Sequence, residues 1–179
     1  EHISFNIKDE YKIEIQNIKK NKNKIQIKRV VKKNSNIPYN EINNTEILDF
    51  MIKDMMDNIS PTDYKTKEIH LFACSLPVKY YGPGSYMNWL RLAWALKNTN
   101  HHSDERLFLT WLKITSNDNC RNTLRGVNNK FDWSNVNDLY EMWINFDNNT
   151  EGLTERSIMY WCKLDSPKQY KIIRESTIE

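Results

Sequence analysis

The sequence is poor in glycine, proline and cysteine: its 179 residues include four glycines, five prolines and three cysteines. The cysteines, Cys74, Cys120 and Cys162, are far apart and form no Cys-x-x-Cys pair. An odd number of separated cysteines argues against a disulfide framework and fits a reducing compartment better. The three thiols are therefore predicted to serve as small buried hydrophobic groups.

Several further absences limit the functions open to this chain. No apolar stretch approaches the ~20 residues that span a bilayer, and nothing resembles a signal peptide, so we expect an intracellular protein without a membrane partner. The segment Gly82-Pro83-Gly84 is not a phosphate loop, because no clear strand precedes it and no Gly-Lys-Ser/Thr follows. Nucleophile motifs, paired metal ligands and an Asp-x-Asp pair at a strand end are also missing, so neither catalysis nor a cofactor is expected within this chain.

Positive charge is concentrated at the N-terminal end. Residues 1–33 contain ten Lys or Arg and four Asp or Glu, a net charge of +6, whereas the remainder contains 16 basic and 19 acidic residues, a net charge of −3. Nonspecific attraction to phosphate should be strongest in this first segment.

Residues 2–31 alternate between apolar and polar side chains, and a period of two predicts three short antiparallel strands with one buried face. The other face of these strands is rich in lysine. Two alternatives remain for it: a basic sheet face that binds nucleic acid, or a solvated face or protected sheet edge.

From residue 45 onward, apolar residues recur at helical spacing and predict a bundle of small helices. The segment 68–76 suits a helix or a strand, and we favour a helix. Five tryptophans lie on the predicted core faces: Trp89, Trp94, Trp111, Trp143 and Trp161. Only Trp133, in a loop, is expected to be exposed. The predicted helices are 45–60, 68–76, 86–97, 104–115, 134–145, 155–164 and 167–176.

These patterns predict an α+β fold that is mainly α, in three parts. Residues 1–33 form the basic strand segment, 34–44 a polar linker that contains Pro38, and 45–179 a compact tryptophan-rich bundle. Because the chain begins at Glu1 rather than at methionine, we interpret it as a piece of a longer protein.

Basic residues beside exposed aromatic rings hold single-stranded nucleic acid by charge and stacking. The alternative for each candidate residue is that it belongs to a solvated surface of mixed charge and contacts no nucleic acid. The residues that we select as candidate nucleic-acid contacts are Lys19, Lys20, Lys22, Lys24, Arg91, Lys113, Arg121, Arg125, Lys130 and Trp133.

Four motifs follow one another in the second half of the chain. The first, from Tyr80 to Asn98, reads Tyr-Tyr-Gly-Pro-Gly-Ser-Tyr-Met-Asn-Trp-Leu-Arg-Leu-Ala-Trp-Ala-Leu-Lys-Asn, and the others are Leu107–Ser116, Leu139–Phe146 and Leu153–Cys162. A tail, Lys163–Tyr170, has the pattern Lys-x-Asp-x-Pro-x-x-Tyr. This order resembles the primase C-terminal domain, a helical domain in primase-helicases of giant viruses, poxvirus-like viruses and some phages. The resemblance covers about half the chain, and Cys162 departs from the alanine that is frequent in the family.

The resemblance implies a position between an archaeo-eukaryotic-type primase domain, of which residues 1–33 would be the end, and a superfamily 3 helicase domain. It implies a non-catalytic module that couples these domains and contacts single-stranded template DNA. The parent would be a homo-hexameric, ATP-dependent viral replication protein of the host cytoplasm or viral factory, with its nucleotide loop and catalytic metals outside this sequence. The alternative is a protein-interaction or oligomerisation module with no nucleic-acid role.

Overall fold

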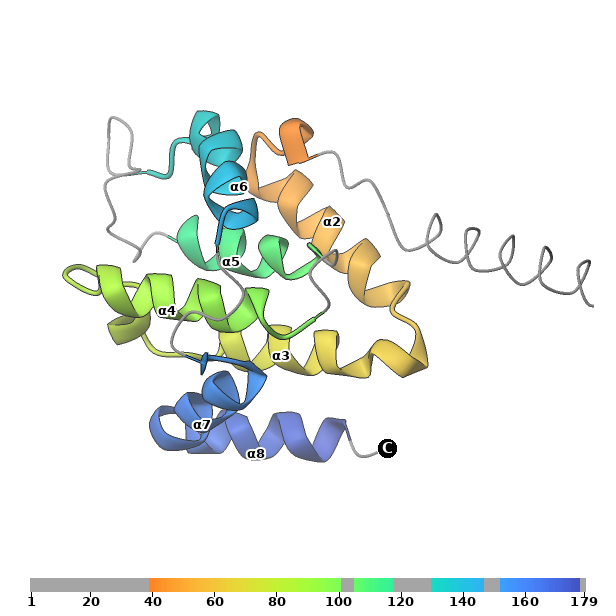
Figure 1. The fold of residues 1–179 in the computed structure, drawn as a ribbon. Helices are drawn as coiled ribbons and strands as arrows, with labels where there is room; N and C mark the ends of the chain where they lie inside the picture. Colours follow the sequence, from red (N-terminus) through yellow and green to blue (C-terminus); the bar gives the residue numbers. More distant parts are fainter. Residues whose placement is uncertain (1–38, 101–104, 118–129, 147–151, 178–179) are drawn as a thin grey trace, which may run out of the picture. The chain divides into compact units, whose positions relative to one another are not determined.

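The structure is a computed structural model that describes residues 39–100, 105–117, 130–146 and 152–177 (Figure 1). All of them belong to the second of the two units into which the chain divides, Pro38–Glu179. The described α-helices are α2 (Thr45–Asp57), α3 (Tyr64–Cys74), α4 (Tyr86–Lys97), α5 (Leu107–Thr115), α6 (Val136–Ile144), α7 (Glu155–Asp165) and α8 (Pro167–Ser176). The 3-10 helices are η1 (Tyr39–Glu41), η2 (Pro61–Asp63), η3 (Val78–Tyr80) and η5 (Trp133–Asn135).

The prediction of an α+β fold class is wrong. The described residues form α-helices and 3-10 helices and include no β-strand or sheet. These helices bury their apolar faces against one another, so the core of this unit is built from helix packing without a sheet. The β part of the prediction depended on the strands expected within residues 2–31, which lie outside the described residues.

The predicted starts of three helices are confirmed, and side-chain caps are present at two of them, whereas the cap expected from Ser166 at α8 is not formed. At α2, the side chain of Asn44 accepts a hydrogen bond of 2.8 Å from the N–H of Ile47. At α7, Thr154 and Ser157 form a reciprocal capping box. At α8, Pro167 occupies the first turn, where its missing N–H costs no hydrogen bond.

The starts of α3 and α5 differ most from the expected residues. The segment 68–76 is helical, as favoured, but α3 begins earlier, at Tyr64, because η2 already starts the turn at Pro61. By contrast, α5 begins later than the expected residue 104. The Glu105 side chain accepts a hydrogen bond from the Tyr140 hydroxyl instead of lying in the first turn of the helix.

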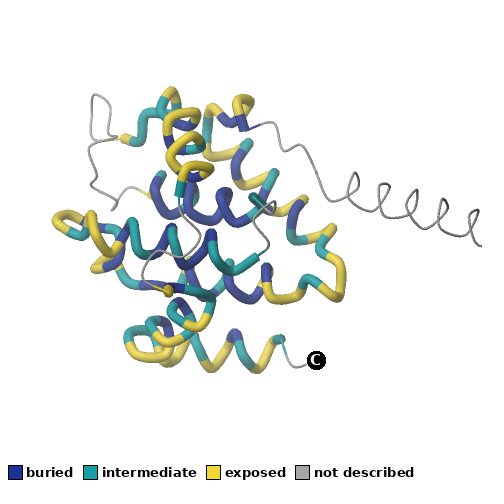
Figure 2. The backbone as a smooth tube through the Cα atoms, viewed as in Figure 1, coloured by how far each residue is buried: buried dark blue, intermediate teal, exposed yellow. Residues whose placement is uncertain are grey.

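Helix α5 is the centre of the core. Eight of its nine residues are buried, and it packs against α2, α3, α4 and α6. An apolar sequence on all sides of a helix is typical of such a central position. Figure 2 shows buried segments from the surrounding helices turned toward α5, while their outer faces are exposed.

Three of the five core tryptophans are confirmed as fully buried: Trp89, Trp111 and Trp143. The ring of Trp111 lies 4.6 Å from that of Trp89 and 5.9 Å from that of Trp143, between centroids. Such ring contacts add to the free energy gained by burying the side chains. The prediction is wrong for Trp94 and Trp161, which are only half-buried because each lies at the edge of its helix's apolar face.

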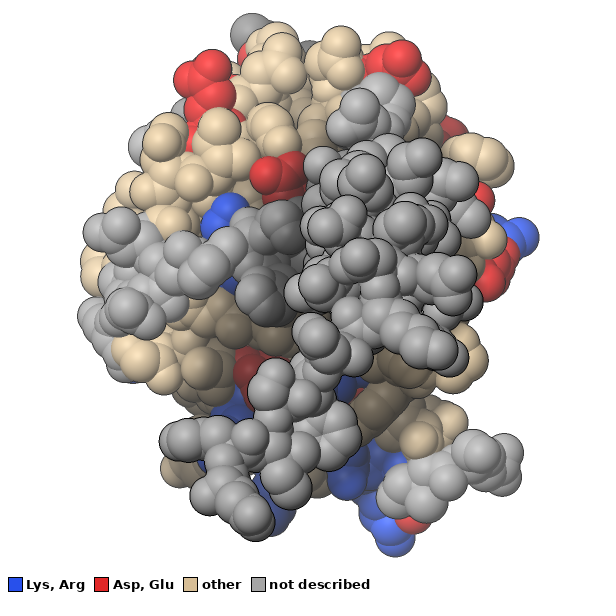
Figure 3. All heavy atoms as spheres, turned by 45° about the vertical axis from the view of Figure 1, so that its right-hand side comes forward, with Lys and Arg blue, Asp and Glu red and all other residues tan. Residues whose placement is uncertain are grey.

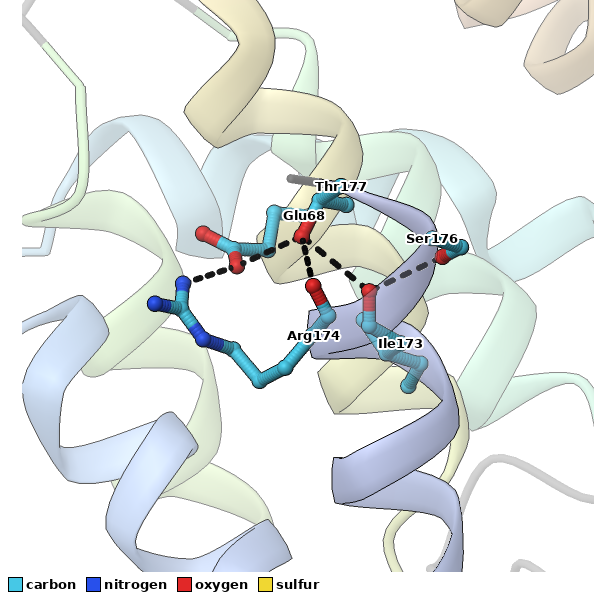
Figure 4. Close-up of polar contacts among 5 residues, drawn as sticks. All are labelled: Glu68, Ile173, Arg174, Ser176 and Thr177. Carbon is cyan, nitrogen blue, oxygen red and sulfur yellow. Dashed lines mark hydrogen bonds and ion pairs between the residues drawn. The ribbon is translucent and has the colours of Figure 1, made fainter. Parts of the chain in front are cut away.

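Helices α7 and α8 lie at the end of the unit away from α2 and α6 (Figure 1) and pack on α3. The stacked rings of Phe72 and Tyr170 hold α8 there, with centroids 5.2 Å apart. Figure 4 shows a second contact, in which Nη1 of Arg174 lies 2.6 Å from Oε1 of the buried Glu68. The hydroxyl of Thr177 donates a further hydrogen bond of 3.2 Å to the same oxygen. A buried carboxylate is thus compensated by two donors from the end of the chain.

Candidate nucleic-acid interface

Of the ten candidate nucleic-acid residues, four are described by the structure. Lys19, Lys20, Lys22, Lys24, Arg121 and Arg125 lie outside the described residues. The Nζ of Lys113 lies 2.5 Å from Oδ1 of Asp49, so its charge is already paired across α5 and α2. Lys130 is exposed, and Trp133 is half-exposed with its ring edge-on to Phe131.

The fourth candidate, Arg91, lines an open cleft of about 230 Å³. Lys79 and Tyr80 of η3 form one side of this cleft, Asn88 and Arg91 of α4 a second, and Trp161 of α7 a third. Sequence reasoning missed four of these five residues. It had assigned Tyr80 to a turn and Trp161 to the core.

A tight turn brings η3 against α4 and so places Lys79 in the same cleft as Arg91. The N–H of Gly82 bonds to the carbonyl of Val78, and a Cβ at this glycine would lie 2.5 Å from Cγ1 of Val78. Only glycine leaves room for this approach. The turn is completed by Gly84, whose φ is +78°. The side chain of Asn88 then donates to the carbonyl of Lys79 over 3.2 Å and ties η3 to α4.

Two aromatic rings and two cations lie together in the cleft. The rings of Tyr80 and Trp161 are tilted by 35°, with centroids 5.5 Å apart. The guanidinium carbon of Arg91 lies 6.0 Å from the centre of the Trp161 ring, at the outer limit of a cation–π contact. The ammonium of Lys79 is similarly 5.5 Å from the ring of Tyr80.

Asp165, the last residue of α7, accepts hydrogen bonds from two cleft residues. Its Oδ1 lies 2.6 Å from Nζ of Lys79, and its Oδ2 lies 2.5 Å from the hydroxyl of Tyr80. The hydrogen bond from Lys79 lowers the pKa of Asp165 most, and the hydrogen bond from Tyr80 lowers it further. Burial, followed by the bond to Asp165, raises the pKa of Tyr80, so Tyr80 remains a neutral donor at neutral pH.

The lining is suited to hold an anion beside a flat ring. Lys79, Arg91 and Asn88 present N–H donors, and charge-assisted bonds from such groups to phosphate are among the stronger hydrogen bonds in proteins. Trp161 supplies a half-exposed ring next to them. A signal for its position was present in the sequence: Trp161 lies beside the buried pair Ile158 and Cys162, at the border of the apolar face of α7.

A second polar cluster joins α3 and α5. Nδ1 of His70 lies 2.8 Å from the hydroxyl of Thr110, and its Nε2 lies 3.7 Å from the sulfur of Cys74. Burial, followed by the charge of Lys113, lowers the pKa of His70 to about 4. The described residues contain no group of three or more His, Cys, Asp or Glu side chains arranged to hold a metal ion.

The prediction of buried cysteines holds for one of the two that the structure describes. Cys162 is buried and free, and burial raises its pKa to about 11. Cys74, the last residue of α3, is exposed, contrary to the prediction. Cys120 lies outside the described residues.

Comparisons with models of known protein families, with curated proteins and with solved structures find no match to this chain. None of the helices that the structure describes has the length and apolar character needed to cross a membrane.

Proposed function

We propose that this chain is a non-catalytic helical module of a viral replicative primase-helicase, and that its cleft contacts single-stranded template DNA. The resemblance of the sequence from Tyr80 onward to the primase C-terminal domain supports this proposal. In that setting, the module couples a primase domain to a superfamily 3 helicase domain within a homo-hexamer. It works in the host cytoplasm or a viral factory, and ATP binding, priming and unwinding belong to the parent protein.

The observation that carries the proposal is that separate motifs meet at one cleft. Asn88 and Arg91 belong to the motif Tyr80–Asn98, and Trp161 belongs to the motif Leu153–Cys162. The tail motif Lys163–Tyr170 adds Asp165, which bonds to Lys79 and Tyr80. Motifs that are distant in the sequence therefore share one location in space, as expected if they serve one site.

The chemistry of the cleft favours a single strand over a duplex. A single strand offers both phosphates and unstacked base faces, whereas a duplex hides its base faces within the stack. Arg91 and Lys79 supply cations for the phosphates, although Lys79 is also paired with Asp165, and Trp161 lies beside them as a stacking surface. Tyr160, which directly precedes Trp161 on α7 and is 63% exposed, adds a further exposed aromatic ring to the same helix.

Basic side chains continue beyond the cleft onto α7 and α8. Lys163, Lys168 and Lys171 are exposed there. In Figure 3, Lys and Arg are seen mainly at the lower end of the unit, where Figure 1 places α7 and α8, and Asp and Glu mainly toward the upper end. This asymmetry orients a polyanion toward the end that contains the cleft.

The test is fluorescence-anisotropy binding of the 179-residue chain to a labelled single-stranded oligonucleotide at about 50 and about 200 mM salt, a range over which phosphate contacts weaken steeply. The starting protein carries alanine at Lys19, Lys20, Lys22 and Lys24, so that these lysines do not mask the cleft. Arg91→Gln is compared with Lys53→Gln, which removes the same charge from an exposed site on α2.

We expect the binding to weaken as salt rises. Arg91→Gln should lower the affinity about tenfold, because it removes one good charge-assisted contact. Lys53→Gln should change the affinity less than about twofold. Equal effects of the two substitutions would show that the cleft is not the site. Binding that disappears with the four lysines would assign the DNA contact to the N-terminal segment instead.

A protein-interaction or oligomerisation module with no nucleic-acid role is the second candidate. Three exposed apolar side chains favour it: Tyr160 and Leu164 on α7 and Ile172 on α8, each more than half exposed. An apolar interface would persist at high salt, whereas phosphate contacts would not. Sedimentation velocity at low and high salt distinguishes the two, because self-association that survives high salt supports the second candidate.

A further inference from the structure

Helix α2 carries an exposed row of acidic residues with an aromatic ring among them. Glu46, Phe50 and Asp54 follow one another at a spacing of four, which places them on one side of the helix, and Asp57 continues the row. All four are exposed, and Phe50, at 71%, is the most exposed of the large hydrophobic side chains described. Lys53 is the single basic residue of this helix, against four acidic ones. These four exposed residues are called the α2 row.

Helix α7 carries a row of the same spacing and the opposite charge. Arg156, Tyr160 and Leu164 also follow one another at a spacing of four, and Lys163 lies next to Leu164 on the same side. Tyr160 and Leu164 are 63% and 61% exposed, and the two cations are exposed as well. These four residues are called the α7 row. Both rows therefore combine exposed apolar groups with charges, which are negative on α2 and positive on α7.

The ion pairs in the described part of the chain leave both rows out. Two acidic residues beside the rows are paired: Asp49 lies 2.5 Å from Lys113, and Asp165 lies 2.6 Å from Lys79. None of the ion pairs between described residues includes a member of either row. The charges of both rows are therefore available to a partner.

One copy of the chain cannot bring its own two rows together. Helix α2 packs on α5, whereas α7 packs on α3, α4 and α8 at the other end of the unit (Figure 1). Two copies can do so, because the α7 row of one copy can lie against the α2 row of another. Glu46 to Asp54 and Arg156 to Leu164 each span eight positions, or about 12 Å of helix, so the rows also match in length.

We infer that the α2 row of one copy docks on the α7 row of a second copy. Phe50 then packs against Tyr160 and Leu164, and the acidic residues of one row lie beside the cations of the other. Because the two surfaces differ, the contact is heterologous and repeats head to tail from copy to copy. No member of either row lines the cleft. The inference rests on the proposed function only in placing this contact between neighbouring modules of the homo-hexamer.

This contact is small and is expected to be weak by itself. One helical row on each side buries less than the ~1,200 Å² at which standard interfaces begin, and exposed ion pairs add little. In a parent protein that is assembled by its other domains, the same contact forms at a high effective concentration. The separate chain therefore requires high protein concentration and low salt, at which exposed charges are least screened.

The experiment is sedimentation velocity of the 179-residue chain at increasing concentration and low salt, without DNA. The four N-terminal lysines are again replaced by alanine, so that they do not compete for the α2 row. One variant reverses the α2 row with Glu46→Lys and Asp54→Lys. A second variant reverses the α7 row with Arg156→Glu and Lys163→Glu.

Matched controls reverse the same number of exposed charges elsewhere. Asp138→Lys with Glu141→Lys on α6 is the control for the α2 row, and Lys65→Glu with Lys67→Glu on α3 is the control for the α7 row. Thermal unfolding establishes that each variant is folded. If a reversed variant does not fold, neutral Gln or Asn at the same positions replaces it and should weaken the association in the same direction.

We expect the sedimentation coefficient of the starting protein to rise with its concentration. Each reversed variant should self-associate at least about tenfold more weakly, because the facing rows then carry like charges. An equimolar mixture of the two reversed variants should regain the association, because every positive row again meets a negative one. The control variants should stay within about twofold of the starting protein.

The apolar part of the contact has its own test. Phe50→Ser should weaken self-association about tenfold, because it removes the ring that packs between Tyr160 and Leu164. Met87→Ser is the control, since it removes an apolar side chain of 53% exposure from α4, and it should have less than a twofold effect.

A starting protein that stays monomeric at every concentration would overturn the inference, and so would a mixture that does not regain the association. If Phe50→Ser weakens self-association but reversal of the α7 row does not, the copies meet through another surface and the inference fails. None of these outcomes decides DNA binding. The proposed function depends on the comparison of Arg91→Gln with Lys53→Gln, so the two can fail separately.

Discussion

The carboxylate of Glu68 in α3 and the guanidinium of Arg174 in α8 lie 2.6 Å apart although 106 positions separate them in the sequence. The Glu68 side chain is 6% exposed and that of Arg174 is 41% exposed. The pair therefore differs from a surface ion pair, since one of its charges is taken out of water. Such a carboxylate is tolerated only with its donors in place.

This asymmetry predicts unequal effects of breaking the pair. Arg174→Met should lower the midpoint of thermal unfolding more than Glu68→Gln does, because it leaves a buried carboxylate without its cation, whereas the glutamine is neutral. Circular dichroism measures both. Lys171→Met is the control, because Lys171 and Glu175 lie 3.8 Å apart on the exposed side of α8. If Arg174→Met costs no more than this control, the contact in Figure 4 does not anchor α8.

The histidine of the second polar cluster predicts a pH-dependent stability. The pKa of His70 is lowered from 6.5 to about 4 in the folded chain. Between these values the unfolded chain binds a proton that the folded chain does not, so stability is fully present above about pH 6.5 and is lost as the pH falls toward 4. One site with this shift contributes up to about 3 kcal/mol.

Urea unfolding at several pH values between about 4 and 7 measures this loss. His70→Gln should give a flatter dependence in this window, because the titrating group is gone. An unchanged pH dependence in the glutamine variant would mean that His70 is not the group responsible.

Two buried tryptophans predict different costs for the same substitution. Nε1 of Trp89 donates to the hydroxyl of Thr115 over 2.9 Å, whereas Nε1 of Trp111 has no hydrogen-bond partner among the residues described. Both rings are buried. Trp89→Phe should therefore cost about 1 kcal/mol more free energy of unfolding than Trp111→Phe, the typical net contribution of one hydrogen bond. Denaturant unfolding of the two variants tests this, and equal losses would contradict it.

The turn before α4 predicts a penalty for any side chain at Gly82. A Cβ there would lie 2.5 Å from Cγ1 and 2.8 Å from the carbonyl oxygen of Val78. Gly82→Ala should destabilise the domain by about 1–3 kcal/mol, as overpacking typically does, and should weaken the proposed DNA binding by displacing Lys79 and Tyr80. Gly84→Asn is the control, because nothing lies within 4 Å of a Cβ at that position and asparagine tolerates its positive φ. A stable Gly82→Ala variant with unchanged DNA binding would contradict this account of the turn.

The helices could be predicted because their signals are local. Asn44 and Thr154 mark helix starts through hydrogen bonds within a few residues, and Pro167 marks one through its fixed φ and missing N–H. Periodicity also identified the central tryptophans, since Trp89, Trp111 and Trp143 repeat with the other apolar residues of their helices. The α+β class failed because its β part depended on alternating apolar residues in 2–31, which lie outside the described residues, whereas the described core contains only helices.

The candidate site could be predicted only in part. Arg91 and Lys113 were selected because they are basic, and Trp133 was selected as an exposed aromatic ring. In the structure, however, Lys113 is paired with Asp49 and Trp133 packs against Phe131. Lys79, Tyr80 and Trp161 were missed because their shared location depends on how η3, α4 and α7 meet. No spacing in the sequence expresses a distance between residues that are about eighty positions apart.

The sequence by itself determined several helix starts, such as those of α2, α7 and α8, most of the apolar helix faces and the need for glycine in the turn before α4. These features depend on bonds and steric contacts among near neighbours. The tertiary structure alone decided which side chains lie together: Glu68 with Arg174, Asp165 with Lys79 and Tyr80, and Arg91 with Trp161. These pairings arise when several apolar faces are buried at once, and that packing fixes the angles and offsets between helices.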